Sequence, residues 1–195
     1  MTKKSARSDC SDLLKALDGR VIVMVGMMGC GKSAVGRRLA ARLGLPFVDA
    51  DDEIQKAAGM KISEIFADQG EEFFRDRERL VIDRLLSQGR QVLATGGGAF
   101  MNEKTRARVR EVGISVWLKA DFDILMRRVG RRGDKRPLLQ GGNREKIMRD
   151  LLEERSPIYA KADIAVESRD GPHDEVVGEI IQQLKSKLTN MSKIS

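Results

Sequence analysis

Short, continuously apolar runs alternate with longer amphipathic stretches along most of this 195-residue chain. Residues Val21–Val25 are apolar at every position, as expected for a strand that is buried on both faces. Residues 34–43 then carry apolar side chains at helical spacing, with arginines between them. The same pattern of apolar and polar positions predicts further strands at 47–49, 91–95, 114–118 and 164–166. It also predicts helices at 11–17, 54–58, 62–67, 72–86, 104–111, 121–129, 144–159 and 174–188.

Five strands that alternate with helices predict an α/β fold with three layers, in which helices cover both faces of a five-stranded parallel sheet. We expect residues 1–19 to form a flexible N-terminal extension, residues 20–189 a single domain, and residues 190–195 a C-terminal tail. The irregular segment 130–142 is rich in glycine and arginine. A loop of that length in a compact domain is usually functional or disordered.

The composition is that of a soluble globular protein, with 41% hydrophobic and 33% charged residues. No apolar run approaches the roughly 18 residues needed to cross a bilayer. The first twelve residues are basic and polar, unlike a secretory signal. The two cysteines do not make a disulfide framework, which favours a reducing compartment. We therefore expect a cytoplasmic protein with no membrane partner.

The net charge of +7 raises the possibility of a nucleic-acid partner. Residues 127–136 contain six basic side chains against Asp134 alone. Such a stretch can follow a phosphate backbone, or it can close over a triphosphate as a lid. Aromatic residues make up only 4% of the chain, which gives little support for base stacking. We favour the lid, and we expect no nucleic-acid partner.

The segment Gly26–Ser33 has the form of a phosphate loop: a glycine, four residues, then Gly-Lys-Ser. Its glycines let the backbone turn N–H groups inward, and these donors, with the positive end of the following helix, can hold phosphates. Lys32 supplies a point charge for the β- and γ-phosphates, and the Ser33 hydroxyl is a ligand for Mg²⁺. A glycine-rich turn alone is the alternative. The strand before the loop and the helix after it favour a nucleoside triphosphate site.

Polar residues follow the second predicted strand, and in parallel sheets ligands bind at the carboxyl ends of strands. Asp49 can orient a metal-bound water, and Asp51 can bind a hydroxyl of an acceptor. An acidic helix start that complements the helix dipole is the alternative, and it suits Asp52 and Glu53. We favour a functional role for Asp49 and Asp51.

Arg75 and Glu78 lie three positions apart and so share one face of the predicted helix 72–86. The pair is either a surface ion pair of little energetic consequence or an arginine that a glutamate holds in place for a substrate carboxylate. The sequence pattern alone does not decide between these two interpretations of the pair.

Three glycines, Gly96, Gly97 and Gly98, directly follow another predicted strand. They let a ligand approach the backbone closely, although a flexible turn is the alternative. Arg136 precedes Pro137 in the irregular segment and could swing onto the phosphates. Arg155 lies near the end of the predicted helix 144–159, where the alternative is a cation that complements the helix dipole.

Together these residues resemble the shikimate kinase family, a branch of the nucleoside-monophosphate-kinase-like P-loop fold. The resemblance runs from about residue 20 to residue 188 and rests on Gly26–Ser33, Asp49-Ala50-Asp51, Arg75 with Glu78, Gly96-Gly97-Gly98, Arg136-Pro137-Leu138-Leu139 and Glu154-Arg155-Ser156-Pro157-Ile158-Tyr159. It implies that the γ-phosphoryl group of ATP moves to the 3-hydroxyl of shikimate, a step toward chorismate and the aromatic amino acids. It also favours a monomer.

The resemblance implies four sets of site residues. The catalytic set is Lys32, Asp51 and Arg136. The nucleotide set is Gly29, Cys30, Gly31, Lys32, Ser33, Ala34, Arg128 and Arg136, with residues 168–172 in the place of the adenine loop. The shikimate set is Asp51, Arg75, Gly96, Gly97, Gly98 and Arg155. The Mg²⁺ set is Ser33, with Asp49 acting through water.

Two departures and several rivals accompany the resemblance. Ala50 stands where the family often has Ser or Thr, and Cys30 is either a small filler of the loop or an oxidation-sensitive thiol. The nearest rival function is another small-molecule kinase, such as gluconate kinase. A nucleoside monophosphate kinase, an ATP-dependent nucleic-acid-binding protein and a pseudokinase are less favoured. His173 is expected to face solvent.

Overall fold

The computed structural model describes residues 11–130, 138 and 142–192. Five strands form one parallel sheet in the order β2-β3-β1-β4-β5: β1 (Val21–Val25), β2 (Phe47–Asp49), β3 (Val92–Ala94), β4 (Gly113–Lys119) and β5 (Ile164–Glu167). The central strand β1 pairs with β3 through Ile22 and Val92, and with β4 through Ile22 and Ile114. The predicted five-stranded parallel sheet is confirmed.

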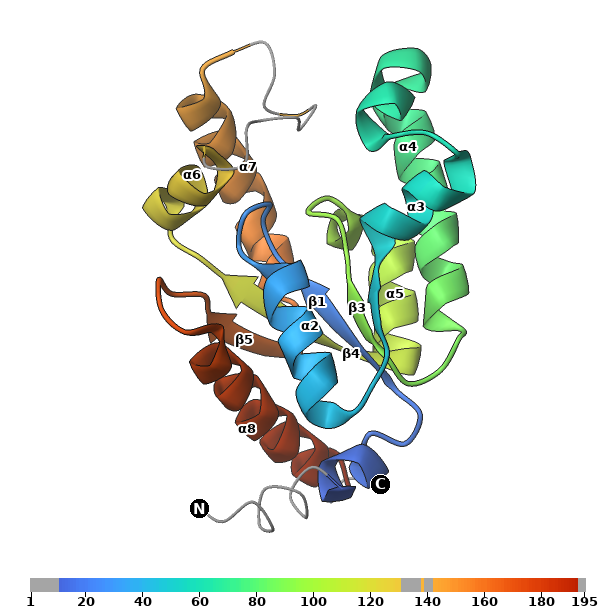
Figure 1. Cartoon of the computed structure of the whole chain (residues 1–195), viewed down its shortest axis with the longest axis vertical. Helices are drawn as coiled ribbons and strands as arrows, with labels where there is room; N and C mark the ends of the chain where they lie inside the picture. The colour runs from blue at the N-terminus through green and yellow to red at the C-terminus, as the bar shows by residue number, and fades with distance from the viewer. Residues whose placement is uncertain (1–10, 131–137, 139–141, 193–195) are drawn as a thin grey trace.

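Helices cover both faces of this sheet (Figure 1). Helices α2 (Lys32–Leu43) and α8 (His173–Ser192) lie in front of the sheet in that view, and α5 (Glu103–Val112) lies behind it. The remaining helices are α3 (Ala50–Ala58), α4 (Ile62–Leu86), α6 (Phe122–Gly130) and α7 (Arg144–Tyr159), with a 3-10 turn η1 at Ala99–Met101. The three-layer α/β architecture is therefore as predicted.

The helix boundaries differ from the sequence prediction at particular residues. The predicted helices 62–67 and 72–86 form one element, α4, which is interrupted only at Gly70, with φ 81° and ψ 173°. Helix α3 begins directly after β2, because Asp49 caps it by accepting a hydrogen bond from the Asp51 N–H. The last helix, α8, continues to Ser192, into the expected tail. The turn η1 was not predicted.

The short helix predicted at 11–17 is confirmed, and it packs on the domain, unlike the flexible extension expected for residues 1–19. Residues 11–16 are helical, and Leu13 and Leu17 are buried in the main hydrophobic core. Arg90 donates a hydrogen bond to the Leu14 carbonyl and ties the segment to the turn before β3. Leu13 and Leu17 are four positions apart, so one apolar stripe of a short helix covers the core here.

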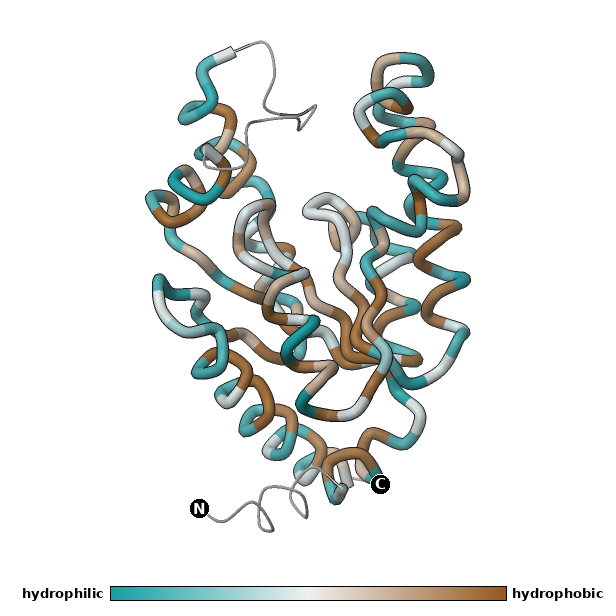
Figure 2. Tube along the Cα trace, viewed as in Figure 1, coloured by the Kyte–Doolittle hydropathy of each residue, from teal (hydrophilic) through white to brown (hydrophobic). Residues whose placement is uncertain are grey.

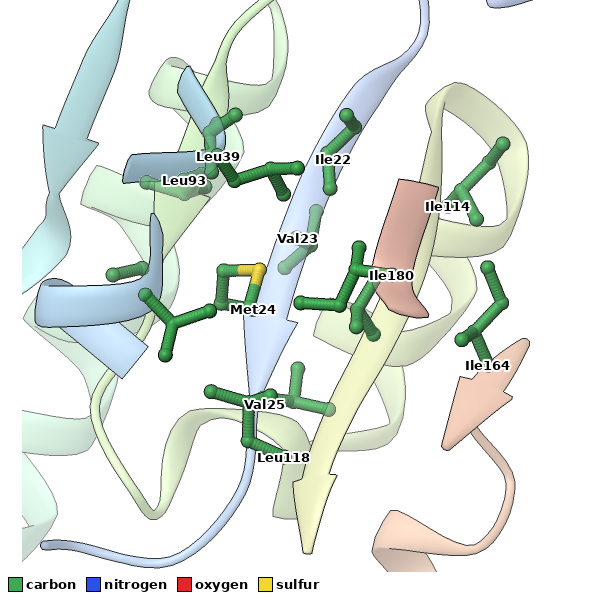
Figure 3. Packing of buried hydrophobic residues seen from close by; sticks show 14 of the residues in the cluster. Ile22, Val23, Met24, Val25, Leu39, Leu93, Ile114, Leu118, Ile164 and Ile180 are labelled. Carbon is green, nitrogen blue, oxygen red and sulfur yellow. The ribbon is translucent and has the colours of Figure 1, made fainter. Parts of the chain in front are cut away.

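The core lies along β1, where every side chain is buried (Figure 3). Leu39 and Ile180, from helices α2 and α8, belong to this core, as do Leu93, Ile114, Leu118 and Ile164 from the other strands of the sheet. Figure 2 shows the resulting pattern, with apolar strands at the centre and helices that turn polar positions outward. Among the described residues, no helix combines the length and the hydropathy that a bilayer crossing requires.

A partly buried polar bridge joins β4 to Asp163, the residue directly before β5. The Asp163 carboxylate accepts hydrogen bonds from the Ser115 N–H at 3.0 Å and the Ser115 hydroxyl at 2.7 Å. Lys187 lies 3.1 Å from the other carboxylate oxygen. Burial alone would raise the pKa of Asp163, but the Ser115 hydrogen bonds and Lys187 outweigh it and lower that pKa. The ionised carboxylate therefore stabilises the fold.

We expect Asp163→Asn to lower the free energy of unfolding by about 1 to 3 kcal/mol at neutral pH, the range for losing hydrogen bonds to a charged group. Because the folded-state pKa is depressed, this contribution is present above the unfolded pKa and is lost as pH falls below about 4. Urea unfolding of both proteins between neutral pH and pH 3 measures the difference. A gap that stays constant across that range would contradict the assignment.

Candidate active site

The phosphate loop Gly26–Ser33 connects β1 to α2 at the carboxyl end of the sheet. Gly26 has φ 132°, and a Cβ atom there would lie 2.6 Å from the Leu118 carbonyl oxygen, so only glycine fits. The Lys32 ammonium folds back over the loop and donates to the carbonyls of Gly26 at 2.8 Å and Met27 at 3.0 Å. The lysine therefore holds the loop through its own carbonyls, and Lys32 also lines the cavity that opens beside the loop.

Ser33 lies next to the first acidic residue of the site. Its hydroxyl donates to Asp49 Oδ2 at 2.6 Å, while Asp49 Oδ1 accepts from the Asp51 N–H at 3.1 Å. One carboxylate thus joins the phosphate loop to the first turn of α3. A cavity of about 370 Å³ opens here, lined by Met28, Gly29, Gly31, Lys32, Ser33, Ala34, Asp49, Asp51, Thr95, Gly96, Gly97, Arg128 and His173.

Asp51 carries the most perturbed carboxyl group of the cavity. Burial is the main cause, and the nearby charges of Asp49 and Glu78 add to it, while Lys32 opposes the shift. The pKa of Asp51 rises to about 6. A carboxyl group with that pKa is mostly ionised at neutral pH and can still accept a proton, as a general base must.

Arg75 and Glu78 form a partly buried pair. The Arg75 guanidinium donates to Glu78 at 2.7 Å and to Glu71 at 2.9 Å, and the Glu78 side chain is only 3% exposed. Burial raises the pKa of Glu78 despite the opposing charge of Arg75. Of the two alternatives for this pair, the structure therefore excludes an exposed surface ion pair. The buried glutamate holds Arg75 in one orientation.

Arg155 is also buried, with 5% of its surface exposed. It reaches the same region as Arg75, because both line a cavity of about 290 Å³ beside Glu78 and Gly98. Within the part of the chain that the structure describes, Arg155 Nε and Nη1 have no hydrogen-bond partner. A buried guanidinium with unused donors is the arrangement expected for binding an anionic ligand group.

The three glycines after β3 make room for these charged side chains. A Cβ atom at Gly96 would lie 2.5 Å from Glu78 Oε1 and 3.1 Å from Asp51 Oδ1, and one at Gly98 would collide with the Arg75 guanidinium. The Tyr159 hydroxyl, at the end of α7, donates to the Gly97 carbonyl. The glycine run therefore serves close packing, in addition to any approach of a ligand.

Arg128 lines the cavity of about 370 Å³ that holds the phosphate loop, whereas Arg155 lines the neighbouring cavity of about 290 Å³. Arg128 extends from α6 and donates to the Ser168 hydroxyl at 2.9 Å and the Arg169 carbonyl at 2.8 Å, so it packs on the segment that follows β5. Arg136 lies outside the described residues, as does most of the expected lid 130–142.

The structure adds two residues to the cavity that the sequence reasoning missed. Thr95 directly follows β3 and donates its hydroxyl to the Met24 carbonyl at 3.0 Å. His173 begins α8 and lines the cavity instead of facing solvent only, and burial, then Arg38 and Arg128, lowers its pKa. Both residues follow a strand at the carboxyl edge of the sheet, where ligands bind in parallel sheets. That position is the sequence signal from which they could have been predicted.

Cys30 and Ala50 are both fully buried. Cys30 Sγ lies 3.8 Å from Lys32 Nζ, inside the loop. Buried thiols are generally inert, which favours the reading of Cys30 as a small filler over an oxidation-sensitive group.

A larger cavity of about 510 Å³ lies between α3 and α4, but its chemistry is different. Apolar side chains such as Ile54, Ile65 and Phe73 line it, and none of the described acidic side chains or glycine loops reaches it. The smaller polar cavity combines a phosphate loop, acidic residues and a perturbed pKa, so we take it as the candidate active site.

Three comparisons connect this geometry to known proteins. Residues 28–185 match the family model described as Shikimate kinase. The chain is 59% identical over 178 residues to a shikimate kinase of Bradyrhizobium diazoefficiens, an alignment that covers 91% of this chain and 86% of the relative. A solved shikimate kinase from Acinetobacter baumannii in complex with shikimate is 39% identical, with a TM-score of 0.82, covering 86% of this chain and 93% of that chain.

The fold is shared more widely. A gluconokinase from Sinorhizobium meliloti superposes with a TM-score of 0.63 at 21% identity, covering 91% of this chain and 98% of that chain. At that identity the likeness concerns the fold alone.

Proposed function

The chain belongs to the shikimate kinase family of ATP-dependent phosphotransferases, and from this premise we propose how its polar cavity acts. ATP places its phosphates in the loop Gly26–Ser33, and its γ-phosphoryl group moves to the 3-hydroxyl of shikimate. One observation carries the proposal. Asp51, with its raised pKa, lies between the phosphate loop and two arginines, the partly buried Arg75 and the buried Arg155.

Shikimate is a small carboxylate with ring hydroxyls. Its carboxylate is best bound by cationic side chains, and its hydroxyls can donate hydrogen bonds to an anionic one. Arg75 and Arg155 bind its carboxylate, because Glu78 holds the first and the second has unused donors. Asp51 accepts a hydrogen bond from the ring hydroxyls and takes the proton of the attacking one. The backbone of Gly96–Gly98 lies between these groups and closes the pocket around the ring.

The residues around Ser33 fit Mg²⁺. The Ser33 hydroxyl and the Asp49 carboxylate lie 2.6 Å apart, and both are the hard oxygen donors that this ion prefers. Mg²⁺ keeps several waters and takes phosphate oxygens, so a cluster of three acidic or histidine ligands is not required, and the described residues contain none. When bound, the ion neutralises charge on the β- and γ-phosphates.

Phosphoryl transfer depends on positioning and charge neutralisation more than on covalent chemistry. Lys32 stabilises the moving phosphoryl group from within the loop. Arg136 adds a second cation, as the family motif implies. Arg128 supports the adenine, with the segment after β5 beneath it. We further propose that the enzyme acts as a cytoplasmic monomer, which its membership of the shikimate kinase family favours.

The proposal is tested by measuring ADP release from Mg-ATP with shikimate, with gluconate, or with no acceptor. We expect turnover with shikimate alone, because the two-arginine clamp and the carboxyl acceptor match a compact hydroxylated acid. Turnover with gluconate alone would keep the phosphate chemistry and overturn the acceptor. ATP binding without turnover on either acid would contradict the kinase proposal itself.

A further inference from the structure

We infer that Ser168 is a positioning residue of the phosphate loop: its hydroxyl fixes the Cys30–Gly31 peptide so that the Gly31 N–H is aimed at a nucleotide phosphate. The inference rests on the proposed ATP site and deepens it. Ser168 follows β5, 138 positions away from Cys30 along the chain, and it is only 3% exposed.

The Ser168 side chain joins three separate parts of the molecule. Its hydroxyl donates to the Cys30 carbonyl at 2.7 Å and accepts from Arg128 Nη1 at 2.9 Å. Its own N–H donates to the Lys119 carbonyl at 2.6 Å, at the end of β4. Two strand ends therefore hold the serine in place, and the serine in turn holds the loop.

The geometry of the peptide group gives this contact its consequence. All described peptide bonds are trans, so the carbonyl of Cys30 and the N–H of Gly31 point to opposite sides of one rigid plane. Ser168 binds the carbonyl on one side. The N–H is thereby directed to the other side, and Gly31 lines the cavity together with Lys32 and Ser33.

Gly31 needs such a constraint because its backbone is unusually free. Its φ is 100°, a conformation that glycine reaches readily, and glycine offers no side chain to hold the peptide in one orientation. Arg128 also donates to the Cys30 carbonyl, but at 3.3 Å, and it donates elsewhere as well. The short bond from Ser168 is therefore the principal anchor of this peptide.

The test separates phosphate binding from adenosine binding. Trp117, the single tryptophan of the chain, packs against Gly26, so its fluorescence reports on the loop. We expect Ser168→Ala to weaken ADP binding about fivefold to tenfold, the size expected for one buried hydrogen bond. Adenosine binding should change less than ADP binding, because adenosine has no phosphate for the Gly31 N–H and Arg128 keeps its bonds to the Arg169 and Cys30 carbonyls. The KM for ATP should rise, with the KM for shikimate unchanged.

Three further variants complete the design. Ser168→Thr keeps the hydroxyl and should restore ADP affinity. Ser115→Ala removes another buried serine hydroxyl that bridges distant segments, here to Asp163, and should lower the thermal midpoint without changing ADP affinity. Lys32→Ala tests the nucleotide site itself and should weaken ADP binding.

The outcomes are distinct. Weaker ADP binding in Ser168→Ala, with adenosine binding retained and rescue by threonine, supports the inference. Unchanged ADP affinity in Ser168→Ala, with a loss in Lys32→Ala, overturns the inference and leaves the proposed function standing. Equal losses of ADP affinity and adenosine affinity in Ser168→Ala overturn the inference as well, because Ser168 would then act on the part of the site that binds adenosine. If Lys32→Ala also binds ADP normally, the proposed nucleotide site fails with it.

Discussion

Replacing Asp51 with asparagine is expected to abolish most phosphoryl transfer and, in the same protein, to raise its thermal stability. The loss of activity follows from the proposed role of Asp51 as the group that takes the proton of the acceptor hydroxyl. General bases contribute about 10²- to 10⁴-fold to rates, so we expect kcat to fall on the order of a thousandfold. Asparagine keeps the shape of the side chain and removes its ability to accept a proton.

The gain in stability follows from the sign of the pKa shift. Burial first, then the charges of Asp49 and Glu78, raise the pKa of Asp51 from 3.8 to about 6. The folded state therefore favours the neutral acid, and stability is lost as pH rises from the unfolded pKa through the folded one. At pH 8 a neutral asparagine avoids that cost, which is worth about 1 to 3 kcal/mol. Below pH 4 the two proteins should unfold alike.

Thermal unfolding at pH 4 and pH 8, together with steady-state rates across that range, measures both effects. In the unmodified enzyme, kcat/KM for shikimate should fall as pH drops below about 6. The matched control is Asp52→Asn, the next residue of α3, whose exposed carboxylate lies 3.8 Å from Arg37. This control should change neither rate nor stability appreciably. A stable and active Asp51→Asn enzyme would contradict the proposed role.

The pairing of lost activity with gained stability has a structural cause. The acidic side chains of Asp49 and Glu78 both lie close enough to Asp51 to raise its pKa. Gly96 has no side chain, which leaves room for the carboxylates of Asp51 and Glu78 beside it. Concentrating like charges in a half-buried cavity costs folding free energy and raises pKa values toward neutrality. The site therefore trades stability for a base that works near neutral pH.

The sheet could be predicted because its strands bury both faces. In β1 every position is apolar and every side chain is buried, so the sequence pattern and the burial agree residue by residue. The positions after the strands were then found from the rule for parallel sheets, which led to Asp49, Asp51 and the glycines after β3. Lys32 and Ser33 came from the spacing of the phosphate loop.

Features that depend on contacts between distant segments could not be predicted in the same way. For Arg75 and Glu78, the sequence fits a surface ion pair as well as an arginine held by a buried glutamate, and only the burial of Glu78 decides between the two. Ser168 has no local pattern at all, since its partners lie in the phosphate loop, α6 and the end of β4. The three leucines Leu13, Leu14 and Leu17 indicate a helix at 11–17, but so short a segment does not tell whether that helix packs on the core or belongs to a flexible extension.

Replacing Arg155 with methionine is expected to weaken shikimate binding on the order of a hundredfold while leaving the fold intact. Truncating one partner of a desolvated charge pair typically costs about 2 to 5 kcal/mol of binding free energy. Stability should change little, because two donors of this buried guanidinium are unused in the part of the protein that the structure describes. Methionine fills a similar volume without a charge.

Arg106→Met provides the contrast, because Arg106 is also buried but its donors are used. It donates to the carbonyls of Phe100 at 2.8 Å and Met101 at 2.7 Å. We expect this variant to lose about 1 to 3 kcal/mol of unfolding free energy, since two carbonyls lose their partner. Titration calorimetry with shikimate and thermal unfolding of both variants measure the two effects. If Arg155→Met lost the greater stability and kept shikimate affinity within about twofold, Arg155 would be a structural arginine, and the carboxylate clamp would rest on Arg75 alone.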